Sequence, residues 1–215
     1  LPRSVLVEPR QATEEELMTF HTRDYINAVQ RLSSGDGNYN PAAYNFSDHG
    51  DNPVFSGMYE ASSWSTGASL TAAEMVSSGQ VDVAFNCSGG LHHAMPSQAS
   101  GFCIFNDPVI AINSLLNQGL RVAYVDIDAH HGDGVQHAFY NSDQVLTISL
   151  HQSGAHLFPG TGFVYEMGRD KGLGYSVNVP LYPSTNDDIY LWAFNNLVPP
   201  LVQAFKPDIL ATQLG

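Results

Sequence analysis

The stretch RVAYVDIDAHHGDG gathers acidic and imidazole side chains of the kind that bind metals. Asp126 and Asp128 end an apolar, β-forming run, and His130, His131 and Asp133 follow within a few residues. Strand side chains alternate between faces, so Asp126, Asp128 and, if the strand continues, His130 should point the same way. Two buried carboxylates ~7 Å apart at Cα are costly unless they are protonated or bridged by a cation. The stretch therefore favours a metal site over a strand end followed by a polar loop.

Two adjacent histidine pairs, His92-His93 and His130-His131, each follow a predicted strand. In a parallel sheet the carboxyl ends of the strands share one edge, so the two pairs can meet there. A metal bound by Asp128 and His130 would have oxygen and nitrogen ligands and an open position. That pattern is typical of catalytic zinc, because structural zinc sites are closed and rich in cysteine.

A hydrolytic zinc site also needs a group that moves protons. Zinc polarises a carbonyl and lowers the pKa of its bound water. A neutral imidazole nearby can take the proton of that water and later pass one to the leaving amine. His92 and His93 are the candidates for this group. Each needs a carboxylate to fix its tautomer and orientation, and Asp126 and Asp133 are available.

Composition and charge exclude other classes of function. The chain has 215 residues, enough for a single domain over 1–215 with a sizeable core. Its net charge is −13 with only 8 basic residues, which argues against a nucleic-acid-binding surface. Cys87 and Cys103 provide neither a disulfide framework nor a cysteine-based zinc site. Without a signal peptide or a membrane-spanning run, we expect a cytoplasmic protein, or a nuclear one if the source is a eukaryote.

Short apolar strands alternate with helices along the chain. We expect helices at 13–32 (one or two), 57–78, 107–119, 133–140 and 187–205. We expect strands at 81–86, 122–125, 145–150, 175–179 and 209–214, with loops at 33–57 and 87–103. Asp107 should cap its helix with Pro108 at the first position, and Pro199-Pro200 should interrupt or delay the last helix. This alternation predicts an α/β fold with a mainly parallel sheet covered by helices on both faces.

Four segments resemble the histone deacetylase superfamily. They are SGGLHHAMPSQASGFCIFND (88–107), YVDIDAHHGDGVQHAF (124–139), TISLHQSGAHLFPGTG (147–162) and YSVNVPL (175–181). The resemblance runs from about Arg10 to Gly215. It is closest to the bacterial acetoin-utilisation branch, since His93-Ala94-Met95-Pro96 stands where eukaryotic class I enzymes tend to carry lysines. It implies an arginase-like α/β fold and zinc-dependent removal of acyl groups from lysine side chains.

The resemblance also implies roles for single residues. Asp128 and His130 match two zinc ligands. His92 and His93 match the tandem active-site histidines, and His93 is then the general base and acid while His92 helps electrostatically. The carboxylate partners implied for His92 and His93 are Asp126 and Asp133, respectively.

The implied substrate is an acetylated lysine in a peptide or protein, with no direct role for nucleic acid or membrane. Gly101 matches the residue whose backbone carbonyl receives the substrate amide N–H. Phe102 and Phe158 match the aromatic walls of the tunnel for the acyl-lysine. Asp51 falls where the family has a rim aspartate that holds the substrate backbone.

The family also binds potassium, so one or two structural K⁺ ions are implied. The first set of matching residues is Asp126, Asp128, His130, Ser149 and Leu150. The second, more peripheral set is Phe139, Ser142, Val145 and Tyr175. A cation at the first set would help to neutralise the two adjacent carboxylates of the opening stretch.

The chain departs from the family pattern at its end. The third zinc ligand of the family is an Asp two residues beyond the Gln-Leu-Gly that here ends at Gly215, and the transition-state Tyr lies later still. Loss of an oxyanion donor costs ~10²–10³-fold in rate. The chain lacks an initiator Met as well, and we expect it to be part of a longer enzyme and inactive alone.

Three other functions remain open. An acetylpolyamine amidohydrolase would share the chemistry, although the 33–57 loop is short for the insertion that narrows the entrance of such enzymes. A two-manganese ureohydrolase would need a carboxylate where Gly132 stands. A non-catalytic acyl-lysine binding module would keep the pocket without turnover.

Overall fold

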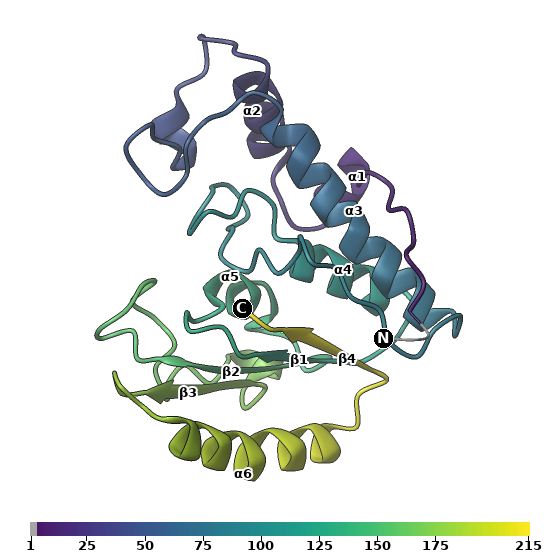
Figure 1. Cartoon of the computed structure of the whole chain (residues 1–215), viewed down its shortest axis with the longest axis vertical. Helices are drawn as coiled ribbons and strands as arrows, with labels where there is room; N and C mark the ends of the chain where they lie inside the picture. The colour runs from purple at the N-terminus through teal and green to yellow at the C-terminus, as the bar shows by residue number, and fades with distance from the viewer. Residues whose placement is uncertain (1–3) are drawn as a thin grey trace.

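The computed structural model describes residues 4–215, which form a four-stranded, all-parallel sheet with helices on both faces (Figure 1). The strands are β1 (Val122–Asp126), β2 (Val145–Gln152), β3 (Ser176–Leu181) and β4 (Ile209–Gln213), in the spatial order β3-β2-β1-β4. At the central strand β1, Val122 pairs with Val145 of β2 and with Ile209 of β4. This arrangement confirms the predicted α/β class.

The sheet is covered on both faces because its central strands are apolar on both sides. Every residue of β1 is buried. Helix α6 (Asp187–Phe205) lies on one face, and α4 (Asp107–Leu116) and α5 (Asp133–Phe139) lie on the other (Figure 1). A near-continuous apolar strand is what a parallel sheet between two helical layers requires. β1 is thereby fixed in the core with only its carboxyl end reaching the molecular edge.

The amino-terminal part forms an outer layer over α4. It contains α1 (Glu14–Leu17), α2 (Arg23–Ser33), the 3-10 helix η1 (Pro41–Tyr44) and the long helix α3 (Met58–Ser77). One or two helices were predicted within 13–32, and the structure has two; Thr13 and Glu16 form the capping box that begins the first. A second short 3-10 helix, η2, spans Asp170–Gly172. Within residues 4–215, no helix has the length and apolar character needed to cross a membrane.

The predicted strand at 81–86 is wrong. The segment is irregular, and Val83 and Phe85 are 83% and 76% exposed. β-branched and aromatic residues favour a position in a sheet. A strand also needs a neighbouring strand with which its backbone can form hydrogen bonds. Here the backbone N–H of Val81 bonds instead to the carbonyl of Met75 at the end of α3.

Two predictions about helix ends also need correction. Asn106, not Asp107, caps α4: its side chain accepts the N–H of Val109 at 3.2 Å, which leaves the Asp107 carboxylate free for other partners. Helix α6 runs without interruption through Pro199-Pro200. The carbonyls that these prolines leave without a helical donor belong to Asn195 and Asn196, which are exposed, so water can replace the missing hydrogen bonds.

Candidate active site

A cavity of about 320 Å³ opens where the loops before α4 and α5 meet the carboxyl end of β1. Residues far apart in the sequence meet here because parallel strands end at one edge of the sheet. Those expected from the sequence to line a site that do line this cavity are Asp51, His92, His93, Gly101, Phe102, Asp128, His130 and Phe158.

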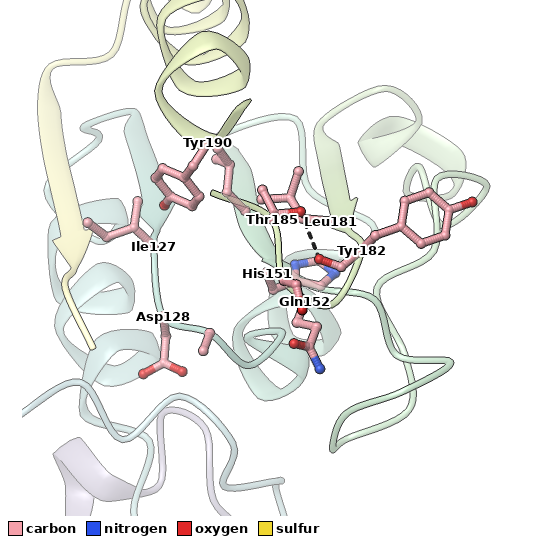
Figure 2. A pocket seen from close by; sticks show the side chains of 11 residues that line it. Ile127, Asp128, His151, Gln152, Leu181, Tyr182, Thr185 and Tyr190 are labelled. Carbon is pink, nitrogen blue, oxygen red and sulfur yellow. Dashed lines mark hydrogen bonds between the residues drawn. The ribbon is translucent and has the colours of Figure 1, made fainter. Parts of the chain in front are cut away.

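A second cavity of about 250 Å³ lies between the ends of β1 and β2 and the start of α6 (Figure 2). Tyr190 reaches from α6 on the side of Ile127, and Asp128 lies at the far end (Figure 2). The ring nitrogens of His151 are already bonded to Ser149 and Gly162. Since only the first cavity combines free imidazole nitrogens with carboxylates, it is the candidate active site.

His92 is joined to a fully buried carboxylate. Its Nδ1 lies 2.6 Å from Oδ2 of Asp126, which also accepts the Tyr124 hydroxyl at 2.8 Å. The other oxygen of Asp126 accepts the N–H of Asp128 at 3.0 Å. Burial lowers the pKa of His92, but the hydrogen bond and the charge of Asp126 outweigh it, and the net pKa is raised.

The close approach of His92 and Asp126 depends on the absence of a side chain at Gly132. A Cβ at this position would contact Oδ2 of Asp126 and come within 3.2 Å of Nδ1 of His92. A carboxylate at position 132, as a two-manganese ureohydrolase needs, would therefore displace this pair.

His93 is paired with the first residue of α5. Its Nδ1 lies 2.7 Å from Oδ1 of Asp133. With Nδ1 donating to the carboxylate, the free nitrogen is Nε2, and the ring lies against His92 with 4.0 Å between centroids. Neither Nε2 has a hydrogen-bond partner among residues 4–215. Two imidazoles thus present a free nitrogen side by side, each oriented by its own carboxylate.

Asp128 and His130 form the candidate metal-binding pair. Oδ1 of Asp128 lies 3.0 Å from Nδ1 of His130. Two tetrahedral zinc ligands at ordinary bond lengths lie about 3.3 Å apart, so the pair fits a shared zinc ion. Burial raises the pKa of Asp128, but hydrogen bonds from the His130 amide and ring outweigh it, and the pKa is lowered, so the carboxylate is charged. Within residues 4–215, no group of three His, Cys, Asp or Glu side chains completes a metal site.

β1 ends at Asp126, so the strand does not extend to His130. The expectation that Asp126 and Asp128 point the same way from one strand, with His130 if the strand continued, therefore does not hold. The chain turns after β1, and Asp126 points inward to His92 while Asp128 and His130 line the cavity.

Aromatic rings form the walls of the cavity. The ring of Phe158 lies 5.0 Å from that of His93 and 6.2 Å from that of His130, centroid to centroid. Phe102 is 75% exposed and has a φ of 67°, a conformation held by the hydrogen bond from its N–H to Oδ1 of Asn52. Gly101, with a φ of 51°, lies so close to His93 and Phe158 that a Cβ would approach their rings to 2.6 and 2.9 Å.

The residues expected to bind potassium lie at the ends of β1 and β2 and around the start of β2, and two of them, Asp128 and His130, also line the cavity. Asp126 is in register with Ser149 at the ends of β1 and β2, and Ser149 Oγ lies 2.8 Å from Nδ1 of His151. The second set lies around the start of β2. The carbonyls of Phe139 and Tyr175 accept the N–H groups of Ser142 and Thr147. The carbonyl of Phe139 keeps a second lone pair for a cation, whereas the carbonyl of Tyr175 also accepts the Thr147 hydroxyl at 3.5 Å. The full sets are Asp126, Asp128, His130, Ser149 and Leu150, and Phe139, Ser142, Val145 and Tyr175.

Two residues of the cavity lining, Gln213 and Cys103, were not predicted from the sequence to belong to the site. Gln213 lines the cavity, and its side chain joins the carbonyl of Gly90 (3.1 Å) to the N–H of Gly215 (2.6 Å). Cys103 also lines it, and burial raises the pKa of its thiol to about 12, so it stays protonated and is no nucleophile. Cys103 stands in the segment 88–107 and Gln213 in the last strand, but nothing in their residue types indicates these contacts.

Comparison with known proteins places the chain in a family. The histone deacetylase domain model matches residues 1–215. The acetoin utilization protein AcuC of Bacillus subtilis (strain 168) is 46% identical over 215 residues, which are 98% of this chain and 54% of the relative. Type-1 histone deacetylase 1 of Dictyostelium discoideum is 43% identical over 211 residues, which are 98% of this chain and 42% of the relative.

Comparison with solved structures leads to the same family. The crystal structure of an HDAC homolog from Aquifex aeolicus superposes with a TM-score of 0.90 at 41% identity, covering 96% of this chain and 56% of that one. The same values hold for the crystal structure of an HDAC homolog complexed with SAHA. The chain spans about half the length of the curated relatives it matches. These matches confirm the resemblance inferred from the sequence, and the chain belongs to the histone deacetylase family.

Proposed function

We propose that the protein containing this chain is a zinc-dependent hydrolase that removes acetyl groups from lysine side chains. The observation that carries the proposal is the convergence of two His–Asp pairs and the Asp128–His130 pair on one cavity with aromatic walls. The family membership supports the same reaction.

His93 is the general base and acid of the proposed reaction. Asp133 holds Nδ1, so Nε2 can take the proton of the attacking water and later return one to the leaving lysine amine. His92, whose pKa is raised by the hydrogen bond to Asp126, would help electrostatically beside the carbonyl on which negative charge develops. Asp126 holds the ring of His92 in place.

Asp128 and His130 would hold the zinc ion, which when bound polarises the acetyl carbonyl and activates water. We propose that the third ligand lies outside residues 1–215, and that this segment alone is inactive, since residues 4–215 offer no third ligand of the usual type. One or two potassium ions would support the site at the two sets described above.

The apolar stem of an acetylated lysine suits the cavity. Phe102 and Phe158 provide apolar walls, and acetylation removes the lysine charge that such walls would oppose. The carbonyl of Gly101 would receive the substrate amide N–H; it already accepts the Cys103 thiol at 3.2 Å and keeps a second lone pair. Asp51, at the cavity lining, would hold the substrate backbone.

The test uses the full-length protein, a fluorogenic acetyl-lysine peptide and acetylputrescine. We expect bound zinc, loss of turnover on chelation, recovery with added zinc, and a fall in kcat of ~10²–10⁴-fold for His93→Ala. His137→Ala, at an exposed position of α5, is the control and should retain full activity. Bound zinc without turnover would instead indicate a binding module, and faster cleavage of acetylputrescine than of the peptide would indicate a polyamine enzyme.

A further inference from the structure

The loop that carries His92 and His93 has little regular structure of its own. Between residues 87 and 103 the chain forms turns and two isolated bridges, Met95 with Gln98 and Ser100 with Cys103. Catalytic side chains must be held to within a fraction of an ångström, so the backbone of this loop must be fixed from outside.

Asn106 contacts the loop on both sides of His93. Its Nδ2 donates to the carbonyl of His92 at 3.2 Å and to the carbonyl of Ala94 at 3.0 Å. Its Oδ1 accepts the N–H of Val109 and so caps α4. Asn106 is completely buried. Both ends of the carboxamide are therefore used, and the amide end bridges the carbonyls of His92 and Ala94, the residues on either side of His93.

Asn106 is itself fixed by a buried histidine. Its backbone N–H donates to Nε2 of His21 at 2.9 Å, and Nδ1 of His21 donates to the carbonyl of Met95 at 3.1 Å. Burial lowers the pKa of His21 to about 4, so the ring is neutral and can accept at one nitrogen and donate at the other. His21 and Asn106 together hold the carbonyls of His92, Ala94 and Met95.

The start of α5 meets the same carbonyls. The N–H of Gly134 donates to the carbonyl of His92 at 3.1 Å. A Cβ at Gly134 would lie 2.6 Å from the carbonyl oxygens of His92 and Ala94 and from Nδ2 of Asn106. Asn106 therefore lies where the loop with His93 and the helix that begins with Asp133 touch.

We propose that Asn106 is a positioning residue that sets both His–Asp pairs, by holding the peptide groups on either side of His93 against the start of α5. The side-chain hydrogen bonds of Asn106 go to the carbonyls of His92 and Ala94 and to the N–H of Val109, so it acts on the loop with the histidines. The kinetic part of this inference rests on the proposed deacetylase function, whereas the geometric part does not.

The test compares Asn106→Ser with Asn186→Ser in the full-length protein. Serine keeps an oxygen that can cap a helix but lacks the amide that spans the two carbonyls. Asn186 is the matched control, because it caps α6 in the same way, accepting the N–H of Ile189 at 3.1 Å. We expect Asn106→Ser to lower kcat by up to ~10²-fold, because small misplacements of catalytic groups have effects of this size. KM should be unchanged. Asn186→Ser should leave both constants unchanged.

A spectroscopic readout separates this inference from the proposed function. The His92–Asp126 and His93–Asp133 pairs should give low-field Nδ1–H proton resonances, which Asn106→Ser should shift or broaden and Asn186→Ser should not. If the wild type lacks deacetylase activity but the resonances respond, the function fails and the positioning role stands. Unchanged resonances and kcat in folded Asn106→Ser would overturn the positioning role. If that variant does not fold, Asn106→Asp, which keeps the size and the capping oxygen, is measured in the same way.

Discussion

At the scale of single residues, the site depends on positions with no reactive group. Gly132 admits the hydrogen bond between His92 and Asp126 only because it has no Cβ. Gly134 allows α5 to approach the carbonyls of His92 and Ala94. The acidic and imidazole groups around these glycines can form their hydrogen bonds because the glycines, which lack side chains, let them approach one another closely.

We predict that Gly132→Ala destabilises the protein by about 1–3 kcal/mol, the usual cost of overpacking, and lowers kcat by at least ~10-fold because His92 loses its carboxylate. Urea unfolding and steady-state kinetics measure the two effects. Gly37→Ala is the control, since a Cβ there meets no atom within 4 Å and the backbone conformation is ordinary. Equal activity of Gly132→Ala and wild type would contradict the requirement for close contact.

The reactive residues could be predicted from the sequence, whereas their supports could not. His92, His93, Asp126, Asp128, His130 and Asp133 belong to residue types that carry chemistry, and Asp126 to Asp133 lie at or just after the carboxyl end of β1, as expected. The strand expected at 81–86, before His92 and His93, is absent, so their position at the site did not follow from a strand end. Asn106 and Gln213 act through side-chain contacts to backbone carbonyls, 12 and more residues away in the case of Asn106. Such contacts depend on tertiary packing, which leaves no period or motif in the sequence.

At the scale of elements, the loop after β2 is fixed by a partly buried polar network that lies beside the site. The Glu166 carboxylate accepts the N–H groups of Gly162 and Phe163 and the amide of Gln136. Burial raises the pKa of Glu166, but these donors outweigh it and the pKa is lowered. His131, which had no assigned role, joins the same network through Thr161 and Gln136. The network holds the loop that carries Phe158.

We predict that Glu166→Ala raises KM several-fold and changes kcat less, because the aromatic wall is loosened while the His–Asp pairs are untouched. The measurement is a full Michaelis–Menten curve with the acetyl-lysine peptide. Glu15→Ala, at an exposed position of α1, should behave as wild type. A fall in kcat with unchanged KM would show that the network acts on the histidines instead.

The helices and strands were predicted well where periodicity and capping agree with packing. The predictions failed where tertiary packing, and not the local sequence, determines the secondary structure. Residues 81–86 have the composition of a strand without a paired edge, and α6 continues through two prolines because its exposed side allows water to satisfy the freed carbonyls.

At the scale of the whole molecule, stability should depend on pH through His21. Its folded-state pKa of about 4 lies below the unfolded value of 6.5. Between these values the unfolded chain binds a proton that the folded chain does not, so the free energy of unfolding falls as the pH falls from 6.5 to 4. We predict a loss of about 3 kcal/mol from this residue over that window. Urea unfolding across this pH range, with the ring titrated by NMR, checks the prediction. A folded-state pKa near 6.5 would contradict it.

The pairing of β1 with β4 has a consequence for how the site is assembled during folding. Val122 of β1 meets Ile209 of β4, and Gln213 of the same strand bonds to the loop before His92. These are contacts between distant parts of the chain, and the entropy of closing so long a loop must be met before they can stabilise anything. The cavity therefore cannot be completed by any local unit of the chain, because part of its lining requires the pairing of β1 with β4.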